Sequence, residues 1–341
     1  RDNTNYRDHS YMARAQLQRF FNDGDNIIIG SEISLDQSRS NVLRNIYEQP
    51  EQRTSAGFAK YRMQLRDNLI LDMGVRYDYR DVTGGEGYSI KSFQALSPKI
   101  SLIYDMNSSL ITYLSYNKGF RAPSISELFL EYESSYGLLL QGNPTLKPES
   151  LNSIESGFKL QKEGVSYFGN VFFNQYSDMI DFIYTIPVRS VNRETVKGIG
   201  AELGSNLYID KTKSNFNFTY SYLNLNESSD APMLYRPKHK IRFTWVQQFS
   251  LLDFRLSTRY VSKQLYEDFL SDTHPIDGNT VIFPLETLPE TIISEFSITK
   301  TFTDYDVSIK VKNLFDNSYV LIQHYPMPGR NFEMSITKSI K

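Results

Sequence analysis

Apolar and polar side chains alternate with a period of two along most of the chain. In residues 69–80, apolar side chains at every second position are interleaved with Asp72, Arg76 and Asp78. The same alternation recurs in residues 27–36, 216–222, 305–312 and 332–340. Successive side chains of a β-strand point to opposite faces of its sheet, so the pattern predicts strands with one apolar and one polar face.

The alternating segments and the turn residues between them predict about fifteen strands. These strands are expected to begin near residues 5, 26, 53, 69, 94, 109, 151, 165, 194, 214, 236, 253, 290, 304 and 331. Many run for about 10 residues or more, whereas globular strands usually hold about 5–6 residues and membrane-crossing strands about 9–11. A soluble β-sandwich, whose polar face would meet bulk water, is the alternative, but the lengths favour strands that cross a membrane.

The links between the predicted strands alternate between short and long. Short links are expected at 22–25, 66–68, 105–109, 161–164, 210–214, 250–253 and 303–304, and long ones near 43–52, 82–92, 121–149, 177–193, 226–235, 268–289 and 316–330. Outer-membrane barrels have tight periplasmic turns and long extracellular loops, whereas a meander sandwich has no reason to sort its loops in this way. The sequence therefore predicts an all-β fold, an antiparallel transmembrane β-barrel.

Composition and charge exclude several other classes of protein. Among 341 residues, 37 are basic and 39 acidic, so bulk charge does not favour nucleic-acid binding. The absence of cysteine excludes disulfides, thiolate metal sites and cysteine catalysis. The four histidines lie far apart, and no Ser/His/Asp constellation can be assembled from the spacing. We therefore expect no enzyme, no resident metal and no cofactor.

Four segments carry recognisable motifs. They read YNKGFRAPSISEL at 116–128, GNPTLKPE at 142–149, VKGIGAEL at 196–203, and VKNLFD at 311–316 followed by PMPGRNF at 326–332. In this order they resemble the motifs of the TonB-dependent outer-membrane receptors, in which Y-x-x-G-F-R-A-P-x-x-x-E-L closes a strand and opens an extracellular loop. The residues that match the family patterns are Gly119, Phe120, Arg121, Pro123, Glu127, Asn143, Pro144, Pro148, Glu149, Asn313, Leu314, Phe315, Asp316, Gly329 and Arg330.

The resemblance implies a barrel of 22 strands around a plug domain, in the outer membrane of a Gram-negative bacterium. Neither a plug domain nor a TonB box is found in residues 1–341. We therefore expect the chain to be the C-terminal portion of the barrel, about 15 strands, with the plug and an odd number of first strands lying before Arg1. The implied partners are the TonB energy-transducing complex, the plug, outer-membrane lipid and, as an option, a surface lipoprotein, but no nucleic acid.

The motif residues are expected to be mainly structural, because glycine permits backbone geometries that other residues resist and proline suits points where a strand leaves its ladder. For Arg121 and Arg330, pairing with carboxylates at the barrel wall is favoured over binding of an anionic ligand. Mid-strand charges are expected to face the lumen and to meet the plug or its water, with a plain water-filled pore as the alternative. These residues are Glu32, Asp72, Arg76, Glu202, Arg255, Arg259, Lys310 and Lys312.

Ligand capture is assigned to the long loops. The candidate ligand-binding residues are Tyr132, Tyr136, His274, His324 and Tyr325. The first hypothesis for function is TonB-dependent active import of a scarce bulky nutrient such as a ferric siderophore, cobalamin or haem. Under this hypothesis an iron chelate, haem or corrinoid is the transported substrate and not a cofactor. A passive porin-like channel is the alternative, and an outer-membrane enzyme is the least favoured reading.

Overall fold

The computed structural model describes residues 5–21, 24–40, 50–84, 89–133, 139–183, 187–229, 231–268, 276–277, 280–281 and 283–338. Within them, the long strands are β1 (Tyr6–Phe20), β2 (Asn26–Ser40), β3 (Glu51–Arg66), β4 (Leu69–Thr83), β5 (Lys91–Asn107), β6 (Leu110–Arg121), β9 (Glu149–Lys162), β10 (Val165–Ile183), β11 (Val188–Ile209), β12 (Ser214–Glu227), β13 (His239–Gln248), β14 (Asp253–Val261), β19 (Thr291–Thr301), β20 (Tyr305–Lys312) and β23 (Asn331–Lys338). Each predicted strand is confirmed by one of these.

Shorter elements lie in the loops between the long strands. They are α1 (Ile125–Phe129), β7 (Glu131–Glu133), β8 (Leu139–Gln141), β15 (Gln264–Glu267), β16 (Ile276–Asp277), β17 (Thr280–Val281), β18 (Leu285–Leu288), β21 (Val320–Ile322) and β22 (Tyr325–Pro326). The sequence pattern did not predict them. In the part of the chain that the structure describes, no helix is long and apolar enough to cross a bilayer.

The long strands form one antiparallel meander in which each pairs with the next. β6 pairs directly with β9, because β7 and β8 lie in the loop between them. The order continues through β14, which pairs with β19, and ends with β20 and β23. With β7 and β8 the sheet has 17 strands. The predicted all-β antiparallel fold is confirmed.

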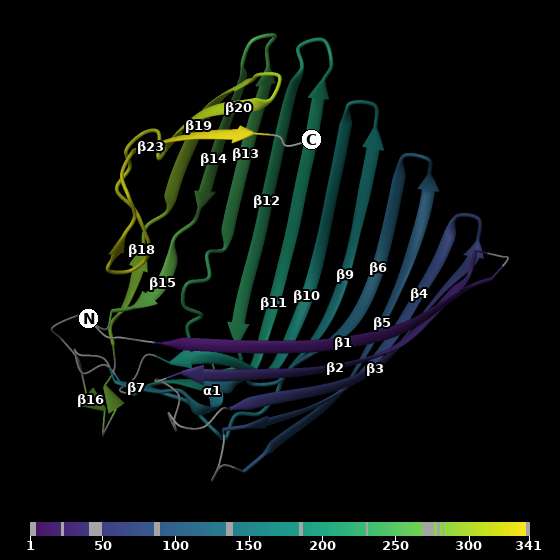
Figure 1. Ribbon diagram of the computed structural model, residues 1–341, viewed down its shortest axis with the longest axis vertical. Coiled ribbons are helices and arrows are strands. Elements are labelled where there is room, and N and C mark those ends of the chain that lie inside the picture. Colours follow the sequence, from purple (N-terminus) through teal and green to yellow (C-terminus); the bar gives the residue numbers. More distant parts are fainter. Residues whose placement is uncertain are drawn as a thin grey trace.

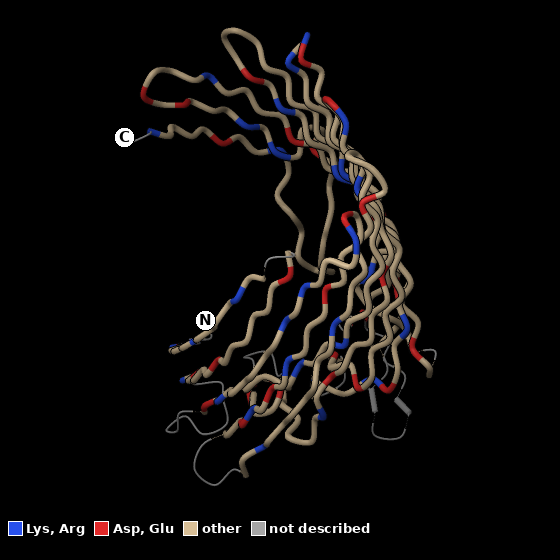
Figure 2. The backbone as a smooth tube through the Cα atoms, turned by 90° about the vertical axis from the view of Figure 1, so that its right-hand side faces the viewer, with Lys and Arg blue, Asp and Glu red and all other residues tan. Residues whose placement is uncertain are grey.

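The sheet curves into an open trough (Figures 1 and 2). In Figure 2 the two ends of the chain lie at opposite lips of the opening. Among the described residues, no hydrogen-bonded ladder joins β1 to β23. Each of these strands therefore has one free edge in this structure.

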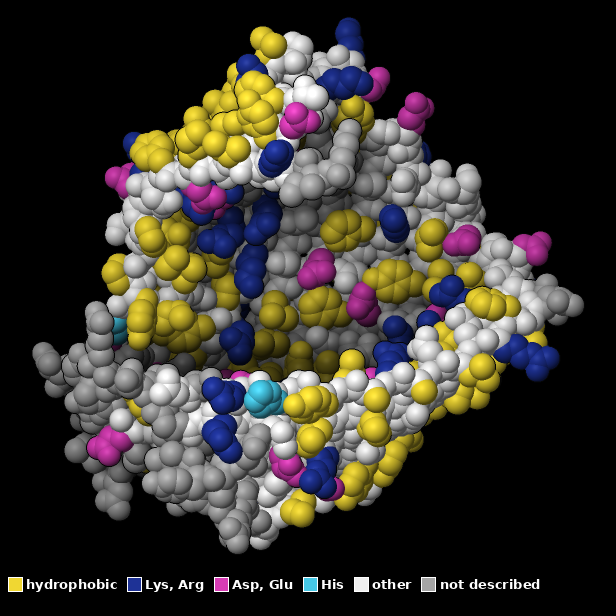
Figure 3. Space-filling model, viewed as in Figure 1, with side chains coloured by type: hydrophobic (Ala, Val, Ile, Leu, Met, Phe, Trp, Pro, Cys, Tyr) yellow, Lys and Arg dark blue, Asp and Glu magenta, His cyan; other side chains and the backbone are white. Residues whose placement is uncertain are grey.

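The strand register places apolar side chains outside the trough and charged ones inside. On β4, Val75 and Tyr77 are 42% and 45% exposed, whereas Asp78 on the other face is buried. Figure 3 shows Lys, Arg, Asp and Glu side chains in the hollow and an apolar band along the outer wall in the foreground. The alternation seen in the sequence therefore separates a lipid-compatible outer face from a charged inner face.

Tight turns gather at one end of the strands, the turn end, and long connections at the other, the loop end (Figure 1). One predicted long loop, 177–193, is wrong. β10 continues to Ile183 and β11 starts at Val188, with Phe182 opposite Ser190. Asp178 has a positive φ of 52°, but β10 and β11 keep the same register on both sides of it. Polar residues such as Arg189, Asn192 and Arg193 interrupt the apolar alternation here, and the sequence pattern therefore seemed to end.

Candidate functional site: the loop-end rim and the inner wall

The first family motif builds a capped helix at the loop end. The backbone N–H of Glu127 donates to the Ser124 hydroxyl at 3.2 Å, and the N–H of Ser124 donates to the Glu127 carboxylate at 2.8 Å. This reciprocal capping box fixes the start of α1 directly after the buried Pro123. At this motif the chain therefore leaves β6 and continues directly into a short helix at the rim.

Arg121 ties this helix to three strands. Its guanidinium donates to both oxygens of Glu127 at 3.0 Å and to Glu149, on β9, at 3.4 Å. The Glu149 carboxylate also accepts the backbone N–H of Ile180, on β10, at 2.9 Å. Of the two alternatives for Arg121, pairing with carboxylates is the one observed here. Within the described residues, the side chain of Arg330 forms no ion pair. The backbone N–H of Arg330 donates to the Asp316 carboxylate at 2.6 Å.

An apolar cluster fills the space under α1. It consists of Val82, Phe93, Ala122, Leu128, Phe129, Leu146 and Ile180, with Phe120 packed against it. Gly142 closes over the helix, because a Cβ there would lie 2.6 Å from backbone atoms of Leu128, Phe129 and Leu130. The predicted reason for the glycine needs correction: Gly142 has no positive φ, and close backbone approach is what requires it.

Asn143 and Pro148 belong to the same rim segment. The Asn143 amide donates to the carbonyl of Ser190 on β11 at 3.0 Å, and its carbonyl oxygen accepts the N–H of Thr145. Pro144 lies in the turn at this point, and Pro148 is half-buried before β9. The second motif thus anchors the returning chain to β11.

The last family motif folds into a compact loop before β23. Asn313 is buried with φ 50°, and its amide donates to the carbonyls of Asn317 and Pro328. Asp316 accepts from Arg330, and a Cβ at Gly329 would lie 2.7 Å from the Asp316 carboxylate. Leu314 bonds to Ser294 of β19 through its backbone, and Phe315 is exposed.

The predicted ligand-binding residues are distributed over separate loops. Tyr132 lies on β7 and Tyr325, 67% exposed, on β22. His324 Nε2 lies 2.9 Å from the Asp268 carboxylate. This contact joins the loop after β20 to the loop after β14. Tyr136 and His274 lie outside the described residues.

A hollow at the loop end has a volume of about 710 Å³. It is lined by the ends of β12, β13 and β14 and by the segments that follow β12 and β14. Its lining mixes apolar Leu223, Leu225 and Met233 with charged Arg236, Lys238 and Glu290. Such a mixed surface can hold a bulky amphipathic molecule.

On β2 to β4 several inner-wall charges pair with one another, whereas Arg14 on β1 and Lys99 on β5 line the same wall without an ion pair among the described residues. Arg76 contacts Glu32 at 3.0 Å and Asp78 at 2.8 Å. Asp72 accepts from Lys60 at 3.3 Å and from Arg62 at 3.0 Å. The lumen-facing prediction holds for Glu32, Asp72 and Arg76, and their partners lie within this chain.

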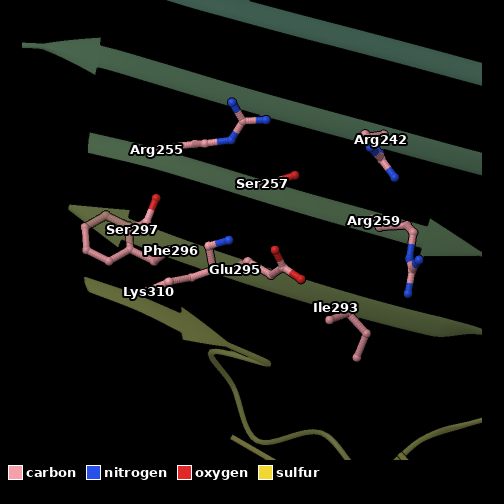
Figure 4. A pocket seen from close by; sticks show the side chains of 9 residues that line it. All are labelled: Arg242, Arg255, Ser257, Arg259, Ile293, Glu295, Phe296, Ser297 and Lys310. Carbon is pink, nitrogen blue, oxygen red and sulfur yellow. The ribbon is translucent and has the colours of Figure 1, made fainter. Parts of the chain in front are cut away.

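On β13 to β20 the inner wall carries a basic hollow of about 310 Å³ (Figure 4). Its charged and hydroxyl lining includes Arg242, Arg255, Ser257, Arg259, Glu295 and Lys310. Within the described part of the chain, none of the four basic side chains forms an ion pair or a side-chain hydrogen bond. An adjoining hollow of about 320 Å³ adds Lys240 and Glu202 to the same wall.

Sequence reasoning singled out Arg255, Arg259 and Lys310 but missed Lys240, Arg242 and Glu295. The available signal was the same alternation, since Lys240 and Arg242 flank Ile241 and Glu295 precedes Phe296. Lys312, also predicted to face the lumen, pairs with Glu333 at 2.5 Å. Among the described residues, no group of three or more His, Asp or Glu side chains is arranged to hold a metal ion.

Comparison with known proteins shows which family and which solved structures this chain resembles. A family model described as "TonB dependent receptor-like, beta-barrel" matches residues 2–314. Similar solved structures include the copper transporter OprC (15% identity, 98% of this chain and 56% of that one, TM-score 0.78). Others are the siderophore receptor PirA from Acinetobacter baumannii (17%, 99% and 55%, TM-score 0.75) and the ferric-catecholate import receptor Fiu from E. coli (14%, 98% and 54%, TM-score 0.73).

At these identities the solved structures establish the fold alone, and the chain spans about half the length of each. The family match is broader, since it covers most of the chain and includes three of the four motifs that the sequence displays. The chain belongs to the family of TonB-dependent receptor β-barrels.

Proposed function

We propose that this chain is part of an outer-membrane receptor that imports a scarce, bulky nutrient with energy supplied through TonB. The observation that carries the proposal is the curved antiparallel sheet with an apolar outer face and a charged inner face, in a chain that matches the receptor family. Such a sheet presents hydrocarbon-compatible side chains to lipid and a wet wall to a lumen.

In this proposal, residues 1–341 supply the C-terminal part, about 15 strands, of a plugged barrel that has 22 strands by family resemblance. The free edges of β1 and β23 support it, because an open edge within a bilayer would leave backbone groups unpaired. A lumen of that width is too large for its own side chains to fill, so a separate plug domain occupies it.

The proposed substrate class is a metal chelate of siderophore type, with cobalamin and haem as further members of the same group of bulky nutrients. The names of the similar structures, a siderophore receptor, a ferric-catecholate import receptor and a copper transporter, favour a metal-containing cargo. The 710 Å³ hollow at the loop end is large enough for a substantial part of such a molecule.

The proposed mechanism assigns capture to the loop end and passage to the inner wall. Tyr132, His324 and Tyr325 offer aromatic surfaces at the rim, which suit large planar or catecholate groups. The Arg121 cluster holds the rim helix in place while the loops adapt. The partners are the plug, outer-membrane lipid and the TonB complex, and the chain itself performs no catalysis.

The test is uptake by cells that carry the complete receptor gene or lack it, with and without a functional TonB system. Radiolabelled ferric siderophores, haem and corrinoids are supplied one at a time under nutrient limitation. We expect uptake of one class to require both the receptor and TonB. Uptake that persists without TonB and shows no saturation would contradict the proposal and indicate a passive porin-like channel.

A further inference from the structure

Two arginines lie side by side on the outer face of the sheet, at the loop end of β1 and β2. Arg7 on β1 is the direct cross-strand partner of Arg39 on β2. Arg14 on β1 lines the inner wall, and Glu32 on β2 is its cross-strand partner on the same face. Alternate positions of a strand face opposite sides of the sheet, so Arg7 and Arg39 point outward. Both are exposed, and we name them the outer arginine pair.

The neighbouring carboxylates do not neutralise the outer arginine pair. Asp8 and Asp36 point inward, and each accepts a serine hydroxyl of the partner strand at 2.6 Å. Glu51, on the outer face of β3, pairs with Arg53 at 2.5 Å. Among the described residues, neither member of the pair forms an ion pair or a side-chain hydrogen bond. Like charges directly opposite one another destabilise a sheet, so this position favours an anion from outside the described chain.

The outward positions of β1 place the pair at one boundary of the membrane. The next outward arginine is Arg19, twelve residues further along the strand, which corresponds to about 40 Å. At a tilt of about 45° this length crosses about 28 Å, close to the thickness of the hydrocarbon layer, about 30 Å. The outer arginine pair therefore lies at the level of the lipid head groups at the loop end, which faces the cell exterior in an outer-membrane barrel.

The outer face next to the pair is apolar along the same two strands. Tyr11 and Leu17 of β1 are 61% and 75% exposed, and Ile29 and Ile33 of β2 are 54% and 60% exposed. Figure 3 shows basic side chains and a histidine beside apolar side chains on the foreground wall, where Figure 1 places β1 and β2. A free anion would use only the arginines of this surface. An amphipathic anion would use both the arginines and the apolar side chains.

We propose that the outer arginine pair binds a phosphorylated lipid of the outer leaflet, with the phosphate between Arg7 and Arg39 and the acyl chains along β1 and β2. A guanidinium group can donate two parallel hydrogen bonds to a phosphate, which makes arginine well suited to this head group. His9 and Gln37, the next outward pair, offer further polar groups to it. The inference goes beyond import and shares with the proposed function only the placement of the sheet in the outer membrane.

The experiment uses the complete receptor, purified in an uncharged detergent. The variants are R7Q/R39Q, the single R39Q, and the control R19Q, which removes the outward arginine at the turn end of the same strand, 5.3 Å from the Phe21 ring. The probes are lipid A with two phosphates, lipid A with one phosphate, and inorganic phosphate. Native mass spectrometry measures the bound fraction of each during a titration, and heat-modifiable migration on gels reports assembly of each variant.

We expect the wild type to bind lipid A with two phosphates more tightly than lipid A with one. R7Q/R39Q should weaken binding of the first about tenfold or more and abolish the preference, and R39Q should have a smaller effect of the same sign. R19Q should resemble the wild type, and inorganic phosphate should bind weakly to all.

Unchanged affinity in R7Q/R39Q, or an equal loss in R19Q, would overturn the inference. If R7Q/R39Q does not assemble, unchanged affinity in R39Q has the same meaning. Inorganic phosphate bound as tightly as lipid A would overturn it in favour of a free-anion site. A protein that co-purifies in place of lipid A and is lost in R7Q/R39Q would overturn it in favour of a protein interface. Failure of the proposed function is recognised separately, by TonB-independent uptake in wild-type cells.

Discussion

At the scale of single residues, close packing at the rim explains why small or polar residues stand at motif positions. Gly142 lies against the backbone of α1, whereas the space beside Gly119 on β6 is open enough that an added Cβ would sit 3.6 Å from Leu151. Two glycines of neighbouring motifs therefore have different physical reasons. Only the first is required by the packing of the rim.

This difference gives a paired prediction. Gly142→Ala should destabilise the receptor by about 1–3 kcal/mol, because the added methyl group overpacks a backbone contact. Gly119→Ala should leave stability nearly unchanged. Thermal and urea unfolding of the purified receptor measures both. Equal stability of the two variants would show that the rim relaxes around residue 142.

A second residue-scale prediction concerns Glu267, on β15 in the loop after β14. Burial raises the pKa of this carboxyl, Arg193 lowers it and Asp181 raises it further. A raised pKa in the folded state favours the protonated form, so the associated stability is present at acidic pH and is lost as pH rises through the folded pKa. Glu267→Gln should therefore stabilise the β15–β18 hairpin at neutral pH and have little effect at acidic pH.

Hydrogen exchange of β15 and β18 at both pH values measures this effect. The exposed Glu286, on the partner strand β18, is the matched control, and Glu286→Gln should change nothing. Stabilisation of the hairpin by Glu267→Gln at acidic pH alone would contradict the prediction.

At the scale of elements, each strand has to keep one face for lipid and one for the lumen. On β20, Ile309 is 53% exposed and lies between Ile298 and Met334 of the neighbouring strands. Ser308, one position earlier, lies between Thr299 and Ser335 on the other face. Adjacent positions on β20 therefore face different surroundings: the side chain of Ile309 faces lipid and that of Ser308 faces the water-filled lumen.

Arginine substitution tests this assignment. Ile309→Arg should cost roughly 2–4 kcal/mol near mid-membrane and impair assembly, and Val307→Arg should do the same. Ser308→Arg should be tolerated because its side chain enters the lumen. The measurement is the fraction of receptor that inserts and resists heat-induced unfolding on gels. Similar losses at positions 308 and 309 would show that the face assignment is wrong.

At the scale of the whole molecule, the two free edges of the sheet decide how the chain behaves on its own. β1 runs over 15 residues without a partner on its outer edge in the described structure, and β23 likewise lacks one. Unpaired edges recruit other strands. In the barrel proposed above, both edges are paired.

Residues 1–341 expressed alone should therefore form oligomers or aggregates in detergent, whereas the complete receptor should run as a single monodisperse species. Size-exclusion chromatography with light scattering compares the two. The cysteine-free chain also permits a direct probe, in which Tyr11→Cys on β1 and Ile336→Cys on β23 are combined. A monodisperse monomer with an efficient intramolecular disulfide would show that the trough closes by itself.

The sequence by itself determined the strands, their faces and the sorting of turns and loops. Period-two alternation is a local property of the chain, and strands such as 69–83 carry it without interruption. The motif residues at the rim were visible for the same reason, since glycine, proline and asparagine mark points where a strand ends. The alternation failed at residues 177–193, where polar side chains break the apolar pattern although β10 and β11 stay paired in one register.

Only the tertiary structure decided which charges meet. Glu32 on β2 and Arg76 on β4 lie 44 positions apart but within 3.0 Å across the intervening strand β3. Arg121 joins Glu149, its cross-strand partner on β9, to Glu127 of α1. The sequence lists these residues without pairing them, because cross-strand distance depends on register and curvature, which many strands set together. The same cooperative geometry leaves Arg242 opposite Arg259 with no carboxylate of the described chain in contact, a property that no local pattern contains.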